Sequence, residues 1–484
     1  MHNSSSAFEK NASAALADTT LQTALGRFQS GFSARRAQAI ARLPEFDELR
    51  DRARQIKEHT LEYLDHYLEQ FEREVVTSGG HVHWAVTPED ARRTILDICR
   101  DAGATSVTKG KSMIAEEIAL NPYLEKNGIE PVETDLGEYI IQLRDEPPSH
   151  IIAPAIHVLK EQVAATFREA HPTLDPSRPL DEARALVDEA REVLRAKFLA
   201  ADVGITGANF LVAETGSAVI VSNEGNCDLT QTLPRVHIVL ASLEKAVPTL
   251  EDAATILRVL ARSATGQEFS TYTTIATGPK RPDDADGPEA FHIVLLDNGR
   301  SGILGGDLRQ ILNCIRCGAC MNHCPVYGAV GGHAYGGVYP GPLGAVLTPA
   351  LDGIAGAGAL PNASTLCGRC EEVCPMRIPL PKLLRHHREH EFARRLGSTR
   401  SRLGLWLWAF LAKRPRLYGM VGGVVMRLLS IAGGKKGRIE HLPLAASWTK
   451  GRDFPVPQGR TFQSLWASSA GDASRLKTTS HRQQ

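Results

Sequence analysis

The 484-residue sequence is short of the features that mark several common classes of protein. Lys and Arg together number 55, and so do Asp and Glu, which leaves no net charge to attract nucleic acid. The longest apolar run, 403–412, is about half of the roughly 20 residues that a membrane-spanning helix needs. The N-terminal segment has no basic stretch followed by an apolar one, which argues against a secretory signal. We therefore expect a cytoplasmic protein that does not bind nucleic acid.

Sequence fingerprints for nucleotide cofactors are also missing. The glycines of 331–337 (GGHAYGG) do not form a G-x-G-x-x-G turn after a strand, so a Rossmann site is not expected. No P-loop sequence occurs. Hydride transfer by this chain alone therefore has no recognisable cofactor site.

Cysteine is the residue type with the most informative distribution. Of nine cysteines, Cys99 and Cys227 stand alone, whereas the other seven lie within 314–374. In a chain without a secretory signal, clustered cysteines favour metal or redox chemistry over a disulfide framework.

The first cysteine group is the C-x2-C-x2-C-x3-C-P run of bacterial ferredoxins, which holds a [4Fe–4S] cluster. Two-residue gaps let a tight turn direct three sulfurs inward, while its backbone N–H groups can donate hydrogen bonds to the cluster sulfides. In two-cluster ferredoxins the fourth cysteine of the run belongs to the other cluster. The run consists of Cys314, Cys317, Cys320 and Cys324, followed by Pro325.

The second group repeats this run without its first cysteine, and Ser364 stands at the missing position. Its members are followed by Pro375, as in the first run. The crossing rule of two-cluster ferredoxins then predicts two sets of ligands. These are Cys314, Cys317, Cys320 and Cys374 for cluster one, and Cys324, Cys367 and Cys370 for cluster two.

Cluster two is left with three thiolates, and three solutions stay open. It is a [4Fe–4S] cluster whose fourth ligand is Ser364, a histidine or water; or it is a [3Fe–4S] cluster; or a partner protein supplies the fourth ligand. Zinc sites use paired C-x2-C units, which these runs do not match. Clusters with a purely structural role are a further alternative.

Upstream of the cysteines, short β-branched runs alternate with helical patterns. This alternation predicts an α/β domain with a largely parallel sheet over about 80–300. Residues 45–75 have the spacing of one long amphipathic helix, and Thr87 with Pro88 opens another. Between the cysteine groups, 328–361 is dense in Gly and Pro, which predicts an irregular loop. The expected strands include 150–157, 210–215, 218–223, 237–243 and 291–298.

Polar residues at the expected strand ends are candidates for a ligand site in the α/β domain. Two lysines and a serine in one loop would suit a small carboxylate. Each candidate also has a simpler explanation, because charged residues at helix starts are usually solvated and a lone histidine is usually structural. The candidates are Lys109, Lys111, Ser112, Glu116, Glu117, His150, His157, Glu214, Thr215, Ser217, Asn223 and Glu224.

The C-terminal part is strongly basic. Residues 376–460 contain eighteen Lys and Arg against four Asp and Glu. Trp406 and Trp408 lie in the apolar run and precede Lys413, a composition typical of an interfacial helix. We expect the aromatic residues to be buried against the cysteine module, with an anionic membrane surface or an acidic partner as the alternatives.

The sequence resembles the lactate utilization protein B family. The resemblance rests on NCIRCGACMNHCPVYGAVGGHAYGGVYPGPLGAVLTP at 313–349 and STLCGRCEEVCP at 364–375. It continues upstream through 109–143, 148–157 and 204–226, and downstream through SWTKGRDFPVP, and so covers about residues 50–466. The absence of a cysteine at Ser364 also matches the family pattern.

The resemblance implies an α/β LUD domain, similar to ribose-5-phosphate isomerase and CoA transferases, followed by a helical ferredoxin-like module. It also implies two [4Fe–4S] clusters and joint action with lactate utilization proteins A and C in oxidising L-lactate to pyruvate, for growth on lactate. The electron acceptor is not identified. The expected parts are a disordered or helical leader (1–44), the LUD domain with N-terminal helices (45–300), the two-cluster module (301–395) and a basic helical region with a disordered tail (396–484).

Three functions therefore compete. The first is an electron-transfer subunit of a lactate-oxidising complex, in the cytoplasm or at the inner face of the cell membrane. The second is an α/β ligand-binding or transferase-type enzyme with redox-sensing clusters. The third is a scaffold whose clusters are structural. Lactate oxidation releases two electrons, whereas each cluster accepts one, so a partner or the incompletely ligated cluster must separate the pair.

Overall fold

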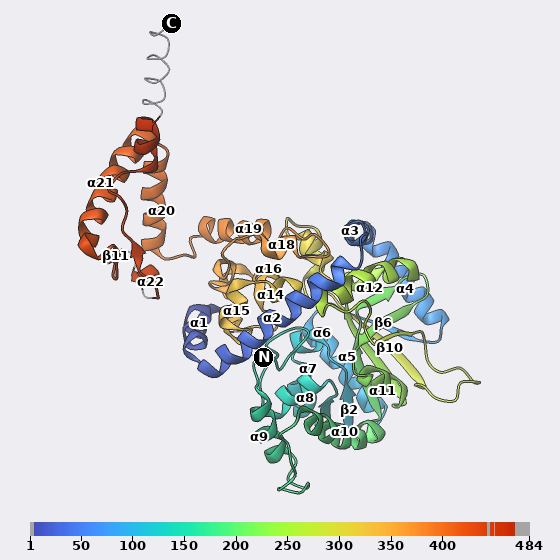
Figure 1. Cartoon of the computed structure of the whole chain (residues 1–484). Coiled ribbons are helices and arrows are strands. Elements are labelled where there is room, and N and C mark those ends of the chain that lie inside the picture. Colours follow the sequence, from blue (N-terminus) through green and yellow to red (C-terminus); the bar gives the residue numbers. More distant parts are fainter. Residues whose placement is uncertain (1–3, 443–445, 450, 470–484) are drawn as a thin grey trace. The chain divides into compact units, whose positions relative to one another are not determined.

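The computed structural model describes residues 4–442, 446–449 and 451–469 (Figure 1). The chain forms two compact units, 1–391 and 392–484. The first unit contains both the sheet domain and nearly all of the expected cluster module. The disordered tail expected after residue 469 lies outside the described residues.

The first unit is built on a six-stranded sheet in the order β1-β10-β7-β4-β2-β3. All neighbouring strands are parallel, with Val203 opposite Val236 in one of the central pairs. This confirms the α/β class and the parallel sheet. The strands are β1 (His81–Ala85), β2 (Ser106–Lys109), β3 (Glu130–Glu133), β4 (Val203–Gly207), β7 (Val236–Ser242) and β10 (Ala290–Leu296).

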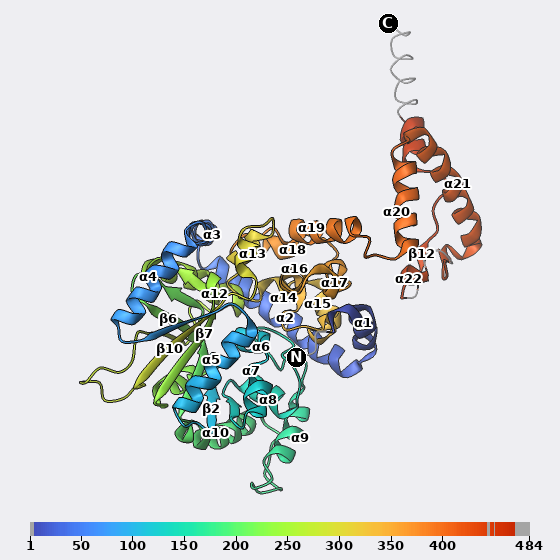
Figure 2. The ribbon, with the colours of Figure 1, turned by 180° about the vertical axis from the view of Figure 1, so that it is seen from behind.

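Alternate side chains of the central strands belong to two different cores. On β10, Phe291 and Ile293 pack in one core with α12, while Val294 and Leu296 pack in another with α5. Figure 2 shows α5 across one face of the sheet. Burial on both faces explains why these strands are continuous apolar runs. The two helices are α5 (Pro88–Asp101) and α12 (Leu250–Ala264).

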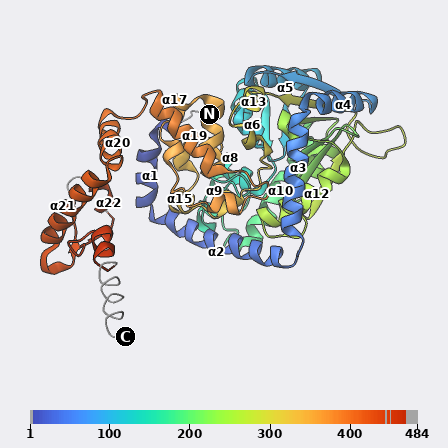
Figure 3. The same ribbon diagram turned by 90° about the horizontal axis from the view of Figure 1, so that it is seen from above.

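A second, four-stranded sheet has the order β8-β5-β6-β9. The strands predicted at 210–215 and 218–223 pair here with each other, with Val212 opposite Ser217. Helices α3 and α12 lie side by side (Figure 3) and both contact this sheet. The strands are β5 (Phe210–Val212), β6 (Ser217–Ser222), β8 (Ala246–Val247) and β9 (Tyr272–Ala276).

The N-terminal helices largely follow the sequence pattern. The single helix expected over 45–75 is two helices, α3 (Phe46–Glu62) and α4 (Leu64–Thr77), because Tyr63 leaves helical geometry. Helix α5 begins as predicted: the Thr87 side chain accepts a hydrogen bond from Asp90 N–H, and the Asp90 carboxylate accepts one from Thr87 N–H.

The leader is helical and packs on the cysteine module (Figures 1 and 3). Phe8 lies edge-on to Tyr335 with ring centroids 5.3 Å apart. Arg36 donates a hydrogen bond of 2.9 Å to the carbonyl of Val373 in the second cysteine run. The leader helices are α1 (Phe8–Ala17) and α2 (Thr19–Ala41).

Two expectations for local structure are wrong. Residues 150–157 form turns and no strand. Residues 328–361 are not an irregular loop throughout, because they include α16 (Gly341–Asp352), whose first nine residues are buried. A Cβ atom at Gly344 would lie 1.5 Å from the carbonyl oxygen of Tyr339, so this glycine permits close packing of the backbone.

The second unit contains α20 (Thr399–Ala412), α21 (Pro415–Gly433) and a small antiparallel pair, β11 (Arg438–Ile439) and β12 (Phe454–Pro455). No residue of α20 is buried, and Trp406 and Trp408 are 59% and 61% exposed. These exposures describe the second unit by itself, and the expected burial against the cysteine module stays a prediction. Among the described residues, no helix combines the length and the apolar character required to cross a membrane.

Candidate iron–sulfur site

The four cysteines predicted to hold cluster one line a single cavity. Its other walls are mostly apolar, including Ile315 and Leu343. Three of the four come from the first run, while the fourth follows a short helix of the second run. The lining cysteines are Cys314, Cys317, Cys320 and Cys374. The arrangement fits a cubane cluster, since thiolates from two loops converge on one enclosed space.

The first run makes its turn through two residues with left-handed backbone conformation, Arg316 (φ 58°) and Gly318 (φ 72°). The Arg316 N–H donates a hydrogen bond of 3.4 Å to Cys314 Sγ. A Cβ atom at Gly318 would lie 2.8 Å from the Ile152 side chain. Both the backbone conformation and the packing therefore favour glycine at this position.

The second run repeats this turn. Leu366 (φ 54°) and Gly368 (φ 83°) have the same left-handed conformations, and a short helix follows each glycine. The Leu366 N–H donates a hydrogen bond of 3.1 Å to Ser364 Oγ. Ser364 thus has the same local hydrogen bond as Cys314, although its side chain ends in oxygen. The short helices are α14 (Ala319–Asn322) and α18 (Arg369–Glu372).

The remaining three cysteines, Cys324, Cys367 and Cys370, interact electrostatically with one another. Burial, followed by the neighbouring Cys324 and Cys367, raises the pKa of the Cys370 thiol to about 12. Cys367 is exposed, and hydrogen bonds from Arg369 N–H and Thr365 lower its pKa. Burial raises the pKa of Cys320 in the first run and Cys370 raises it further, and the ligand sets remain predictions.

Backbone and side-chain donors surround the cysteine sulfurs. Cys374 Sγ accepts a hydrogen bond of 3.4 Å from Ile378 N–H, and Cys324 Sγ accepts one of 3.5 Å from Tyr327 N–H. Arg50 on α3 donates to the Cys374 carbonyl at 2.7 Å. Burial raises the pKa of Cys374 to about 11, so ionisation of this thiol requires nearby positive charge, which iron would supply.

A buried ionic network joins the sheet domain to the first cysteine run. Arg300 pairs with Glu117 at 2.7 Å and with Glu244 at 2.9 Å, and Arg316 pairs with Glu244 at 3.1 Å. Tyr339 donates a hydrogen bond of 2.6 Å to Glu117. Burial opposes ionisation of Glu244, but the two arginines, together with Lys245, lower its pKa to about 2. Sequence reasoning selected only Glu117 of this network, because no local pattern connects the others.

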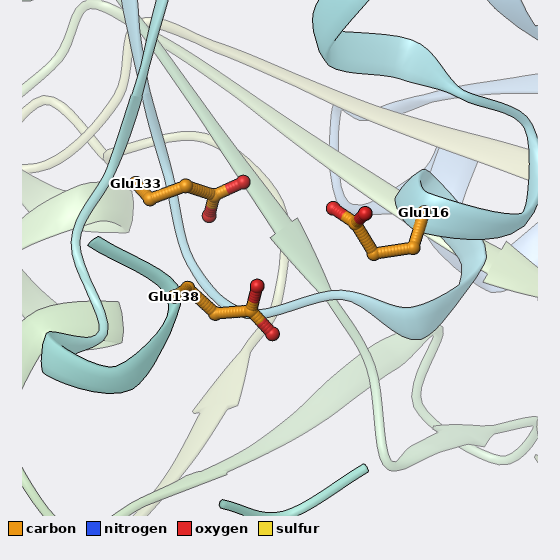
Figure 4. Close-up of side chains that lie close together, drawn as sticks. All are labelled: Glu116, Glu133 and Glu138. Atoms are coloured by element: carbon orange, nitrogen blue, oxygen red, sulfur yellow. The ribbon is translucent and has the colours of Figure 1, made fainter. Parts of the chain in front are cut away.

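Lys109 lies among three carboxylates rather than in a free ligand site. Figure 4 shows Glu116, Glu133 and Glu138 with their carboxylates turned toward one another. The Lys109 ammonium lies 2.6 Å from Glu133 and 3.3 Å from Glu116. Burial, with the neighbouring Glu133, raises the pKa of Glu138 well above its usual range. Lys109 and Glu116 are thus committed to a buried charge cluster.

Four of the sequence candidates meet in a larger cavity of about 450 Å³. This cavity includes residues that follow β2, β3 and β4, so it lies at the carboxyl ends of parallel strands, where α/β sheets bind ligands. Lys245, Arg316 and Cys317 also line it. The four candidates are Lys111, Ser112, Asn223 and Glu224.

The other candidates have structural roles. His150 faces Asn322 at 3.0 Å, and burial lowers its pKa to about 4. His157 lies 2.7 Å from Glu146. Glu214 accepts a hydrogen bond from the Leu250 N–H at the start of α12. The hydroxyls of Thr215 and Ser217 bond to each other at 2.7 Å.

Comparisons with known proteins match both parts of this unit. A family model described as the LUD domain matches residues 68–296, and one described as a 4Fe-4S dicluster domain matches 310–378. The chain is 42% identical over 466 residues to lactate utilization protein B of Lysinibacillus sphaericus, covering 96% of this chain and 97% of that protein. It is 43% identical over 459 residues to lactate utilization protein B of Bacillus licheniformis, covering 94% and 95%.

A relative from Escherichia coli carries a different name. It is called the uncharacterized electron transport protein YkgF and is 42% identical over 449 residues, which cover 92% of this chain and 93% of that protein. The matches extend over nearly the whole chain and include both the parallel-sheet domain and the cysteine module. With a LUD domain followed by a 4Fe-4S dicluster domain, the chain belongs to the lactate utilization protein B family.

Proposed function

We propose that this chain is the iron–sulfur electron-transfer subunit of a complex that oxidises L-lactate to pyruvate and supports growth on lactate. The observation that carries the proposal is the convergence of four cysteines from two distant runs on one cavity. The other three cysteines provide for a second cluster, so the chain would hold two [4Fe–4S] clusters. The names of two relatives refer to lactate utilization and to electron transport, and these names support the proposal.

The partners proposed from the family are lactate utilization proteins A and C. Lactate oxidation releases two electrons, and an iron–sulfur cluster accepts one at a time. We therefore assign the separation of the electron pair to a partner subunit and single-electron conduction to this chain. We propose a cytoplasmic location for the complex, with an electron acceptor outside this chain.

The test is a lactate-dependent reduction of the purified proteins under anaerobic conditions. Iron and sulfide analysis should give about eight of each per chain, as two cubanes require. Adding L-lactate together with the two partner proteins should produce the EPR signal of reduced clusters. Intact clusters that stay oxidised in the full mixture would rule out the proposal and favour a redox-sensing enzyme. If the clusters are reduced but cysteine variants of the chain still support growth on lactate, the clusters have a structural role.

For cluster two we propose Ser364 Oγ as the fourth ligand. The hydrogen bond from Leu366 N–H to Ser364 reproduces the one from Arg316 N–H to Cys314. The left-handed turn that follows is also the same in both runs. A serine oxygen at this position would complete a [4Fe–4S] cluster without a partner protein.

Substitutions at Ser364 should change cluster two alone. Ser364→Ala is expected to convert cluster two to [3Fe–4S] on oxidation, which EPR detects, while Ser364→Cys should keep four irons and shift the midpoint potential. Ser13→Ala is the control, because Ser13 is an exposed hydroxyl residue whose hydrogen bond stays within α1. A Ser364→Ala protein with an unchanged spectrum would exclude Ser364 as a ligand.

We further propose that the second unit contacts anionic membranes through α20. Its tryptophans are exposed on the second unit taken by itself, and the surrounding sequence is basic, with Lys413 and Arg414 at the end of the helix. Binding to vesicles that contain phosphatidylglycerol should exceed binding to neutral vesicles and should fall with salt. The double variant Trp406→Ser, Trp408→Ser should weaken it at least tenfold. Trp84→Ser in the first unit is the control, and equal binding by both variants would contradict the proposal.

A further inference from the structure

The cavity of about 450 Å³ at the carboxyl ends of the strands is lined by a lysine for which no ion pair is formed among the described residues. Two of its three cations are paired: Lys111 lies 3.2 Å from Asp135, and Arg316 lies 3.1 Å from Glu244. Lys245 is only 8% exposed, and in the described part of the chain its ammonium makes no hydrogen bond or ion pair. Lys245 is therefore the cation available to a ligand.

Burial of the Lys245 ammonium without an ion pair is destabilising, so an apolar side chain at this position should make the protein more stable. Burial and Arg316 lower the pKa of Lys245 to about 8, so the ammonium is still mostly protonated at neutral pH. Destabilising charges that persist in a cavity are typical of binding sites.

Burial lowers the pKa of Lys245 and Glu244 raises it, but the Glu244 carboxylate already pairs with Arg300 and Arg316. The acidic residues that line the cavity have other partners as well. Asp135 already pairs with Lys111. Glu224 accepts a hydrogen bond of 3.1 Å from Leu136 N–H, and burial together with Asp135 raises its pKa. An anionic ligand would supply the missing negative charge, and apolar side chains such as Ile220 and Leu260 would contact its carbon atoms.

The cavity shares a wall with the proposed cluster-one site. Cys317 lines both cavities, and the neighbouring Arg316 lines the larger one. A ligand held at Lys245 would thus occupy the same cavity as a thiolate ligand of cluster one. Its negative charge would alter the electrostatic environment of the cluster.

We propose that this cavity binds a small 2-hydroxy or 2-oxo carboxylate, with the carboxylate paired to Lys245 beside the cluster-one cysteines. The choice of acid rests on the proposed function, whereas anion binding rests on the unpaired lysine itself. The cavity is larger than a three-carbon acid needs, so it also admits a longer 2-hydroxy acid.

The test measures binding to the full chain, isolated anaerobically with its clusters. The probes are L-lactate, pyruvate and 2-hydroxyhexanoate, titrated by calorimetry and followed by EPR of cluster one. Lys245→Met should weaken binding at least tenfold and should raise the melting temperature, whereas Lys245→Arg should retain binding. Lys126→Met, which removes an exposed charge outside the cavity, should leave binding unchanged.

Several outcomes would overturn this inference while leaving the electron-transfer proposal intact. One is that none of the three probes binds a protein with intact, reducible clusters. Another is that Lys245→Met binds them as tightly as the unmodified chain. A third is that Lys245→Met lowers the melting temperature, since the lysine would then be structural. In contrast, probe binding to a protein whose clusters never reduce with lactate and the partners would support this site and contradict the proposed function.

Discussion

Cys374→Ala should remove cluster one and preserve cluster two, although Cys374 belongs to the second cysteine run. The reason is that Cys374 lines the cavity together with three cysteines of the first run. Cys324→Ala should have the opposite effect, because Cys324 groups electrostatically with Cys367 and Cys370. In each variant the iron content should fall from about eight to about four per chain if the damaged cluster is lost entirely.

The measurement is iron analysis combined with EPR of the reduced proteins, since the two clusters should have different spectra and potentials. Lactate-dependent reduction of the surviving cluster would show where electrons enter. Cys99→Ala is the control, because Cys99 is a buried cysteine of α5 outside the module. If Cys324→Ala removes cluster one and Cys374→Ala removes cluster two, each run holds its own cluster and the crossing assignment is wrong.

The second large expected effect is a loss of stability when Arg300 is replaced. This side chain is 1% exposed and pairs with both Glu117 and Glu244. Arg300→Met leaves Glu117 without a cation, and breaking a buried ion pair in this way costs about 3–5 kcal/mol. That is a large fraction of the roughly 5–15 kcal/mol that stabilises a typical domain.

Urea unfolding of the anaerobic protein tests this prediction, with far-UV circular dichroism and cluster absorbance followed together. Because the network also contains Arg316 of the first cysteine run, the cluster signal should be lost at a lower urea concentration than in the unmodified protein. Arg309→Met is the matched control: Arg309 pairs with Glu62 at the surface, where an ion pair is worth about 0–1 kcal/mol. Similar midpoints for the two variants would mean that the network does not couple the sheet domain to the module.

Local interactions explain the parts that sequence analysis predicted well. The spacing of the cysteine runs specifies a turn, and the same left-handed residues recur at Arg316 and Leu366. The cap at Thr87 and the buried strands of the parallel sheet are likewise specified by residues close in sequence. The position of Ser364 was visible as a gap in a repeat. In all these cases the physical cause acts over a few residues.

Contacts between segments that are far apart in the sequence decided the features that sequence analysis did not predict. The Gly- and Pro-rich segment contains helix α16, which is buried against other parts of the first unit such as α14. Lys109 became part of a charge cluster, since β3 and α8 (Leu136–Leu143) bring Glu133 and Glu138 to it.

The candidate ligand cavity shows most clearly which features follow from local sequence and which depend on tertiary contacts. The sequence by itself determined the chemistry available at the cysteines and placed Lys111 and Ser112 after a strand of an α/β sheet. Only the tertiary structure decided that Lys111 is neutralised by Asp135, that Lys245 is buried without a partner, and that Cys317 lines this cavity. The physical reason is that desolvation and charge pairing depend on which distant segments surround a side chain, and residue order alone does not specify those neighbours.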